Sequence, residues 1–398
     1  MSTRLHKIPR TIWALGFVSL FMDLSSELVH SLLPVFLVST LGVSVVTVGL
    51  IEGVSEAATP IVKVFSGALS DFFRRRKILI LLGYGMAALT KPLFPLATSA
   101  EAVFVARFLD RIGKGIRGAP RDALVADVAP PAIRGACFGL RQSMDTVGAV
   151  LGPLLAMLLM LWLANDIKRV LWFAVLPAII TVLLIVVGVE EPEHKSGHRF
   201  QSPIRADALK RFSGDYWRLV AVGAIFTLAR FSEAFLVLRA REVGFSITWV
   251  PLVMVVISLV YAVSAFPAGI ISDRMNRRSL LAIGLLLLIV ADLVFAWARA
   301  PLVILLGVVL WGLHMGFTQG ILAAMVADVT PPELKGTAFG LFNLASGLFM
   351  LLASVIAGGL WDRYGAATTF YAGAALSLVA LAMLVCLGRQ HTTRASQS

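Results

Sequence analysis

The feature that most constrains this chain is a series of apolar runs, each about 20 residues long, that recur from Thr11 to Leu387. A run of that length crosses the hydrocarbon core of a bilayer as a helix. We predict twelve spans, near residues 11–38, 46–70, 78–98, 102–125, 137–163, 170–189, 219–241, 249–272, 279–298, 302–326, 337–360 and 368–388. Because lipid offers backbone groups no hydrogen-bond partner, and because no strand alternation is seen, we expect an all-α membrane protein and not a barrel.

Composition and charge agree with this fold class. Hydrophobic residues make up 58% of the chain and charged residues 15%, whereas soluble domains average about 45–50% apolar and about 25% charged residues. This excludes an ordinary soluble enzyme, a disordered chain and a fibrous protein. The net charge of +12 comes mostly from lysines and arginines in alternate connections between spans. That distribution predicts both termini in the cytoplasm, a multi-pass protein of the cytoplasmic (inner) membrane, and no nucleic-acid partner.

The two halves of the sequence repeat each other. Residues 123–140 and 324–341 are identical at 11 of 18 positions, with an offset of 201. A long polar stretch separates the halves. We therefore predict an N-terminal six-helix bundle at 1–189, a cytoplasmic linker at 190–218 and a C-terminal six-helix bundle at 219–398. Two like halves of six helices are typical of a transporter whose halves rock about a central site.

A glycine–aspartate–arginine motif follows the second span and recurs after the eighth. Its residues are Gly67, Asp71, Arg75 and Arg76 in the first copy and Gly269, Asp273, Arg274, Arg277 and Arg278 in the second. The glycine allows close helix approach, and the aspartate can pair with an arginine or a helix N-terminus. With the duplication, this motif resembles the Major Facilitator Superfamily over nearly the whole chain, although Phe72 and Arg74 replace the usual Arg and Gly. The resemblance implies a cytoplasmic latch that breaks during transport; simple anchoring at the cytoplasmic surface is the alternative.

A second motif, in the fifth span, resembles the antiporter signature of the same family and points to its bacterial efflux subgroup. Its residues are Gly139, Gly148, Gly152 and Pro153. Glycines on one face let two helices touch, and the proline bends the helix. Ala156 and Met157 stand where the signature has a Gly pair. The resemblance implies exchange rather than uptake, and generic packing of small residues is the alternative.

The fourth predicted span is unusually charged. Within sixteen residues it carries Arg107, Asp110, Arg111, Lys114, Arg117, Arg121 and Asp122. Most of them fall on one helical stripe, where ionised groups are costly unless paired or hydrated. The resemblance places Arg111 on a family motif linked to proton coupling. The repeat-equivalent tenth span is nearly uncharged, so the charge indicates a site and not a requirement of the architecture.

Acidic residues are spaced so that they can face these cations. Asp23, Glu27 and His30 share one face of the first span, while Asp145 follows Arg141, and Glu233 follows Arg230, by about one helical turn. The proton-coupling candidates are Asp23, Glu27, Glu56, Arg111, Asp145 and Glu233. The substrate-cavity candidates are His30, Glu52, Lys114, Arg117, Arg141, Arg230, Trp311 and His314. A carboxylate whose neighbours change between two conformations can load and release a proton. A fixed network of buried ion pairs is the alternative.

These patterns predict proton-coupled efflux of a small molecule or ion by alternating access. The expected protein is a monomer in the lipid bilayer, uses no cofactor and takes H⁺ as coupling ion; sodium remains an alternative. Asp23, Glu27 and His30 also suit a divalent transition metal as substrate, whereas the basic fourth span suits an organic anion. A transport-dead sensor or scaffold is a further alternative. An enzyme is not expected, since the sequence has no HExxH or GxSxG motif, and the lack of GxxxxGK[ST] excludes a pump driven by its own ATP hydrolysis.

Overall fold

The computed structural model describes residues 8–73, 75–192, 209, 211–272, 275–331 and 334–395. Every regular element in these ranges is helical. By its contacts the chain forms two units. Unit 1 comprises Met1–Gly42, Val54–Pro203 and Ile247–Val255, and unit 2 comprises Val43–Gly53, Ile204–Ser246 and Val256–Ser398.

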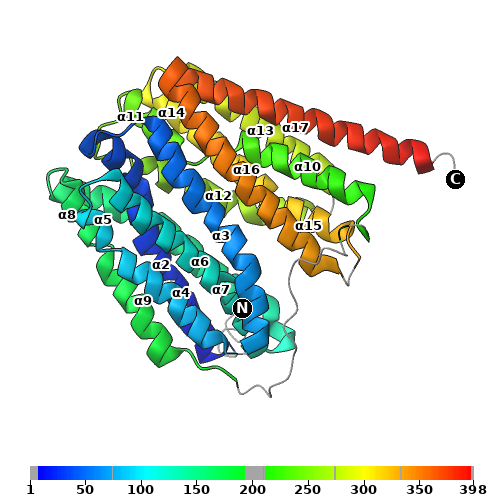
Figure 1. Cartoon of the computed structure of the whole chain (residues 1–398), viewed down its shortest axis with the longest axis horizontal. Coiled ribbons are helices and arrows are strands. Elements are labelled where there is room, and N and C mark those ends of the chain that lie inside the picture. The colour runs from blue at the N-terminus through cyan, green and yellow to red at the C-terminus, as the bar shows by residue number, and fades with distance from the viewer. Residues whose placement is uncertain are drawn as a thin grey trace. The chain divides into compact units, whose positions relative to one another are not determined.

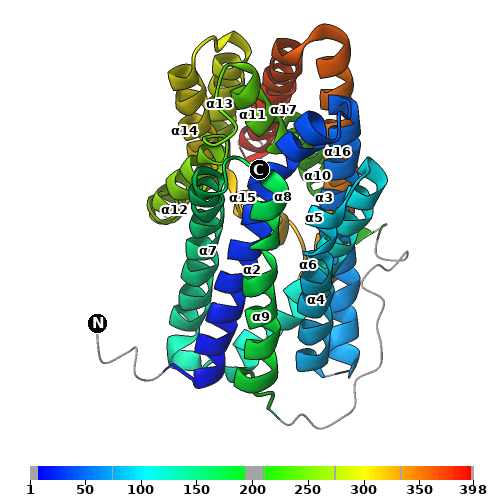
Figure 2. The ribbon, with the colours of Figure 1, turned by 90° about the vertical axis from the view of Figure 1, so that its left-hand side faces the viewer.

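Unit 1 is built from long helices that lie side by side. They are α2 (Arg10–Val35) with the π-helical turn η1 (Phe36–Thr40), α3 (Val45–Phe73) from Val54 onward, α4 (Arg76–Thr90), α5 (Leu93–Leu96), α6 (Ala100–Val128), the 3₁₀ turn η2 (Pro131–Ile133), α7 (Arg134–Trp162), α8 (Ile167–Trp172) and α9 (Val175–Gly188). Helix α2 packs along α7 and α9, and α4 packs along α6, as Figures 1 and 2 show. Apolar side chains such as Leu15, Ile80 and Ile185 form the core between these helices.

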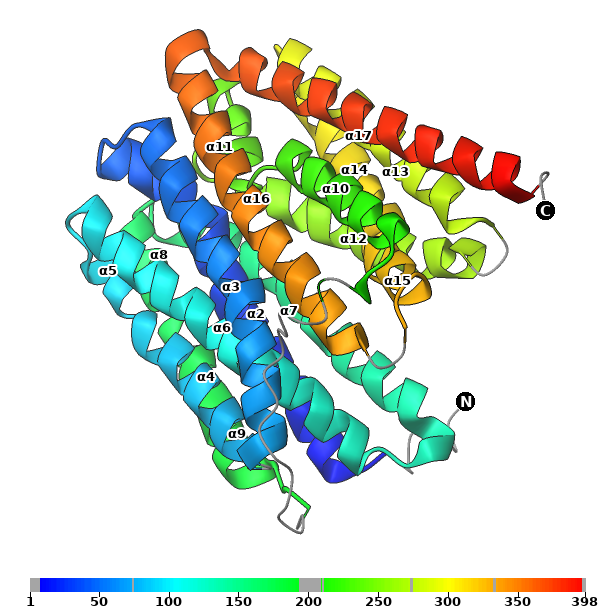
Figure 3. The same ribbon diagram turned by 45° about the vertical axis from the view of Figure 1, so that its right-hand side comes forward.

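Unit 2 has a comparable set of helices. They are α10 (Gly214–Ala229), α11 (Ala234–Glu242), α12 (Leu252–Ser272) from Val256 onward, α13 (Arg277–Trp297), α14 (Pro301–Thr318), α15 (Ile321–Asp328), α16 (Lys335–Tyr364) and α17 (Ala366–Ala395). Helix α13 packs against α14 and α17, and α10 against α16 and α17 (Figure 3). The core includes Tyr216, Leu281, Leu285 and Leu384.

Among the described residues, ten helices are long and apolar enough to cross a membrane. The chain is therefore a multi-pass membrane protein. The other two predicted spans also coincide with helices. The fourth is α6, whose charges lower its mean hydropathy, and the eighth lies in α12, where the apolar stretch Leu252–Ala265 is short.

Two predicted spans of unit 2 are interrupted, which differs from the continuous spans expected at 219–241 and 302–326. Helix α10 ends at Ala229 and α11 begins at Ala234, with the Ser232 hydroxyl accepting a hydrogen bond from the Ala234 N–H at 3.2 Å. Helix α14 ends before Gly320, whose φ of +84° favours glycine. Broken helices in transporters expose backbone groups that can hold substrates or ions.

The first turns of α3 are part of unit 2, although they fall in the predicted N-terminal bundle. Asp362 on α16 accepts hydrogen bonds from the N–H groups of Val45 and Val46 at 3.1 and 2.8 Å. At Gly49, an added Cβ atom would stand 2.2 Å from the carbonyl oxygen of Ser354. Only glycine permits this approach, so α3 and α16 are in backbone contact here.

Candidate functional site

The predicted face of α2 carries an ionisable pair. The Nδ1 atom of His30 lies 3.3 Å from Glu27 Oε2, and the two side chains are only 10% and 16% exposed. The spacing read from the sequence therefore brings these two residues into direct contact. Because imidazole is cationic only when protonated, the pair becomes an ion pair only after His30 gains a proton.

The third residue of this face, Asp23, meets Asp145 of α7. The two carboxyl groups are electrostatic neighbours. Two adjacent carboxylates repel each other when both are ionised, which favours a proton on one of them. Asp145 Oδ1 also lies 3.6 Å from Arg141 Nη1 and 3.8 Å from Arg121 Nη1. We call Asp23 and Asp145 the carboxyl pair.

The glycine–proline motif explains why α2 and α7 approach closely enough to form this pair. An added Cβ at Gly148 would stand 2.3 Å from the carbonyl oxygen of Leu20, and one at Gly152 would stand 2.7 Å from that of Leu24. Pro153 is buried within α7. Gly139, in contrast, has no neighbouring atom within 4 Å of an added Cβ. Two of the three motif glycines therefore make close contacts between α7 and α2.

We expect Gly148→Ala to destabilise the protein by about 1–3 kcal/mol, because the added methyl group must push α2 and α7 apart. Thermal or denaturant unfolding of the purified protein in detergent measures this change. Gly139→Ala is the matched control in the same helix; it should be neutral or slightly stabilising, since alanine favours helix over glycine. Equal losses in both variants would contradict the close contact at Gly148.

Helix α6 supplies two buried arginines that converge on one carboxylate of α3. Glu56 Oε1 lies 3.1 Å from Arg107 Nη2 and 2.9 Å from Arg111 Nε. The side chains of Arg107 and Arg111 are 1% and 2% exposed, whereas that of Glu56 is 29% exposed. A single carboxylate thus balances two guanidinium groups, and the trio keeps an excess of positive charge.

Lys114 occupies the same stripe of α6 and is half-buried. It is an electrostatic neighbour of Asp23, Glu27 and Glu56. No ion pair of its ammonium group within 4.0 Å occurs among the described carboxylates of unit 1. Lys114 therefore acts electrostatically on three acidic groups without forming an ion pair with any of them.

The remaining arginines of α6 have mainly structural contacts. Arg117 is buried, with its guanidinium 4.4 Å from the ring centroid of Tyr84. Arg121 donates hydrogen bonds to the hydroxyl groups of Ser19 and Tyr84, each at 3.3 Å. Arg117, a substrate-cavity candidate, is thus packed against an aromatic ring.

The metal alternative meets an electrostatic obstacle. Of the predicted trio Asp23, Glu27 and His30, only His30 belongs to a group of possible metal ligands among the described residues. Its possible ligand atom lies within 4.8 Å of that of Glu56, and buried Glu52 precedes Glu56 by one turn on α3. Glu56, however, already pairs with two arginines. Those positive charges disfavour a divalent cation at the same carboxylate.

The predicted site residues of unit 2 are not part of a charged helical stripe like that of α6. The expected one-turn spacing of Arg230 and Glu233 is wrong, because the helix ends at Ala229 and resumes at Ala234. Trp311 and His314 are both fully buried. The Nδ1 atom of His314 lies 2.8 Å from the carbonyl oxygen of Gly284, so His314 ties α14 to α13.

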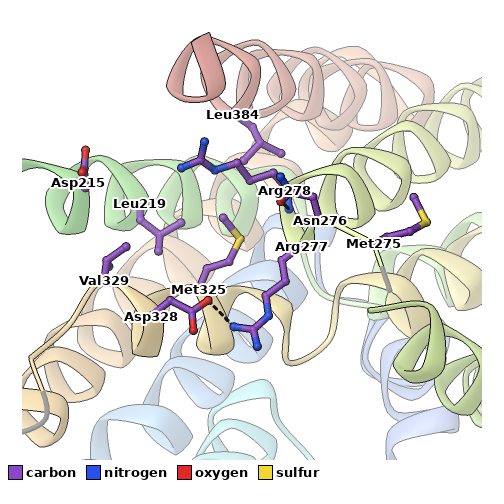
Figure 4. A pocket seen from close by; sticks show the side chains of 10 residues that line it. All are labelled: Asp215, Leu219, Met275, Asn276, Arg277, Arg278, Met325, Asp328, Val329 and Leu384. Carbon is purple, nitrogen blue, oxygen red and sulfur yellow. Dashed lines mark hydrogen bonds and ion pairs between the residues drawn. The ribbon is translucent and has the colours of Figure 1, made fainter. Parts of the chain in front are cut away.

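The two latch motifs make equivalent ion pairs within their own units. Arg76 pairs with Asp127 at the end of α6, and Arg277 pairs with Asp328 at the end of α15. Figure 4 shows the second pair beside a cavity of about 370 Å³. Arg277 lies 201 residues after Arg76, and Asp328 lies 201 residues after Asp127. The two aspartates belong to the repeated stretch. Neither aspartate was among the site residues predicted from the sequence.

The other latch residues are only partly described. Arg75 is exposed, and Arg278 lines the cavity beside Arg277. An added Cβ at Gly67 would stand 3.3 Å from Ala119 Cβ, so this glycine does permit close approach of α3 and α6. Asp273, Arg274 and the surroundings of Asp71 and Gly269 lie outside the described residues.

Comparison with known proteins identifies relatives along the whole chain. The sequence profile of the Major Facilitator Superfamily matches residues 15–239 and residues 219–398. An uncharacterized MFS-type transporter of Methanocaldococcus jannaschii is 31% identical over 386 residues, covering 96% of this chain and 95% of the relative. A probable 4-methylmuconolactone transporter of Cupriavidus pinatubonensis is 26% identical over 352 residues, covering 83% of this chain and 78% of that protein.

Among solved structures, a crystal structure of a mutant of the nucleoside transporter NupG superposes with a TM-score of 0.80. The match covers 95% of this chain and 99% of that chain, at 14% sequence identity. Similarity at this level shows a shared fold and carries no information on substrate.

Proposed function

The chain belongs to the Major Facilitator Superfamily and is a membrane transporter, and on this premise we propose that it exchanges protons for a small-molecule substrate. Transport would follow alternating access, with twelve spans, both termini in the cytoplasm and the protein in the cytoplasmic membrane as a monomer without cofactor. The bundles would be residues 1–189 and 219–398, joined by a cytoplasmic linker. The direction we propose is efflux.

The carboxyl pair supports proton coupling more strongly than any other feature. Asp23 is half-buried, and Asp145 and Lys114 are its electrostatic neighbours. Loss of the shared proton leaves two adjacent negative charges, which repel each other unless a cation approaches or the helices separate. A proton and a positively charged substrate group would therefore compete for the pair, which is the requirement for exchange.

A second candidate is transport of an organic anion. The excess positive charge of Arg107 and Arg111 over Glu56, and the uncommitted ammonium of Lys114, favour an anionic group. The relative named as a probable 4-methylmuconolactone transporter is compatible with such a substrate. An anion that engages Lys114 would weaken its attraction for the carboxylates, so those groups would take up protons. The two candidates predict proton movements of opposite sign.

The test is a pH-indicator measurement on purified protein as substrates are added, with cationic drugs, organic anions and divalent metals as the panel. Exchange predicts that protons are released when the substrate binds. Asp23→Asn should reduce that release, because it removes one member of the carboxyl pair. Glu27→Gln should reduce it because it removes the carboxylate that stabilises a proton on His30. Glu101→Gln, an exposed position at the start of α6, is the matched control and should release protons as the parent does.

Each outcome of this measurement has a distinct meaning. Proton uptake on binding an organic anion would replace exchange by co-transport and establish the second candidate. Release caused by divalent metals alone would favour metal export. Binding itself can be followed by calorimetry in buffers of different ionisation enthalpy. Substrate binding without any proton movement would contradict proton coupling in unit 1.

A further inference from the structure

Asp292 is a carboxyl group in the interior of unit 2 that the sequence analysis did not single out. It lies on α13, is 0% exposed, and neither of its oxygens has a hydrogen-bond partner among the described residues. An isolated carboxylate in an apolar interior is so costly that the group takes up a proton instead. Packing alone therefore does not explain why a carboxyl group occupies this position.

A group of aromatic rings lies beside this carboxyl group, and one of them, Phe231, approaches it at Gly373. Phe231 lies 5.5 Å from Phe370 and 5.9 Å from Trp311, and Phe295 lies 5.1 Å from Phe370, all measured between ring centroids. We call Phe231, Phe295, Trp311 and Phe370 the aromatic cluster. On α17, an added Cβ at Gly373 would stand 2.7 Å from Asp292 Oδ2 and 3.0 Å from a Phe231 ring carbon. The missing side chain of Gly373 thus provides the space that the carboxyl group fills.

The charged and titratable groups near Asp292 do not neutralise it. On the elements that pack against α13 or against the aromatic cluster they include His314, Asp328, Tyr371, Arg230, Glu233, Arg239, Arg241, Glu242, Lys335, Asp362, Arg363 and Tyr364. The Arg239 guanidinium donates to the carbonyl oxygens of Phe295 and Ala298 at 3.0 and 2.9 Å. His314 bonds to the Gly284 carbonyl, two turns before Asp292. Among the described residues, Asp292 forms no ion pair within 4.0 Å, and neither of its oxygens has a hydrogen-bond partner.

The residues around Asp292 limit which ligand its carboxyl group can bind. A sodium or calcium ion needs several oxygen ligands, yet neither carboxyl oxygen meets another polar group in the described part of unit 2. An organic ammonium ion could use the rings, but the side chain is fully enclosed and Gly373 leaves space for the carboxyl group only. A proton needs no added volume and no further ligand.

We propose that Asp292 is a second proton-binding site, carried by unit 2 and closed by the aromatic cluster. In the conformation described the carboxyl group holds its proton. Phe231 stands in the non-helical segment between α10 and α11, so a rearrangement of this break moves the ring that covers Asp292. Opening exposes the group to water, where it gives up its proton to the solvent, and closing requires that a proton be taken back. This proposal does not depend on the exchange proposed for unit 1.

Infrared difference spectroscopy of the full-length protein in detergent, with protons and deuterons as the probe, tests the proposal without a substrate. The parent at neutral pH should show the carbonyl-stretch band of a protonated carboxylic acid that Asp292→Asn lacks. In D₂O the band should shift as the proton exchanges. Asp362→Asn removes an exposed carboxylate of the same unit and should leave the band unchanged.

Gly373→Ala provides a second variant that retains the acid. Its methyl group crowds Asp292 Oδ2, so the band should persist at an altered frequency. Identical spectra of the parent and Asp292→Asn at neutral pH would show that Asp292 is ionised, which overturns the proposal. A band that never shifts in D₂O would equally overturn it, because a sealed proton cannot take part in a cycle.

Discussion

Replacing Lys91 by methionine should lower the free energy of unfolding by about 3 kcal/mol. The Lys91 ammonium lies 2.8 Å from Asp110 Oδ1 and donates to the Ser26 hydroxyl at 3.0 Å. Both charged side chains are almost completely buried, at 1% and 2% exposure. Methionine fills similar space but leaves the Asp110 carboxylate without this partner. We expect the lower end of the range for broken buried pairs, because Arg111 and Arg117 also act on Asp110.

Two further variants separate charge loss from altered packing. Lys91→Met combined with Asp110→Leu removes both charges, so most of the stability should return, since an apolar pair can replace a buried ion pair. Lys77→Met, at the half-buried start of α4, removes one hydrogen bond to the Val186 carbonyl and should change stability by only about 1 kcal/mol. Chemical unfolding in mixed micelles measures all three. A loss in the double variant as large as in the single one would refute the role of the ion pair.

The sequence was sufficient to place the helices because apolar runs carry their own signal. Every predicted span overlaps one or two helices, including the charged α6, which lacks the composition of a typical membrane span. The interruptions of the seventh and tenth spans were not predicted. A break depends on how neighbouring helices replace lost backbone hydrogen bonds, and a lone Gly320 or Ser232 is too common a residue to signal it.

Helical periodicity predicted which residues of the candidate site lie on the same face of one helix. Spacing placed Asp23, Glu27 and His30 on one face and Asp145 one turn from Arg141, and the structure brings these residues into the expected vicinity. The contact between Asp23 and Asp145 could not follow from spacing, because it depends on which helices pack together. The glycine motif indicated a close contact of α7 without naming its partner helix.

The contacts that were not predicted from the sequence are mainly those between side chains of different helices. Asp127 and Asp328 stood in the repeated stretch, and their equal offset from Arg76 and Arg277 was a readable signal. Asp292 had no such signal. One carboxyl group in an otherwise apolar helix can face solvent, a partner or an apolar interior, and only the packing of α13, α14 and α17 decides among them.

Asp145→Asn should uncouple proton movement from substrate movement while leaving substrate exchange across the membrane largely intact. The change removes one member of the carboxyl pair, so Asp23 loses the neighbour with which it shares a proton. Arg121 and Arg141 lose a common acceptor but keep contacts with Asp122 and Gln142, so the helices should stay in place. A coupling free energy of about 1–3 kcal/mol corresponds to a loss of roughly 5-fold to 150-fold in transport driven by a pH gradient.

Proteoliposomes loaded with the substrate identified by the pH-indicator panel separate these two activities. Exchange of labelled for unlabelled substrate needs no net proton movement, so the variant should retain it; net transport driven by an imposed pH gradient should fall. Asp23→Asn should give the same pattern, and both changes together should add little, because the two carboxyl groups hold one proton between them. If instead the two single losses simply added, Asp23 and Asp145 would be independent proton sites. Unchanged proton-driven transport in both variants would move the coupling site away from the carboxyl pair, toward Glu27 and His30.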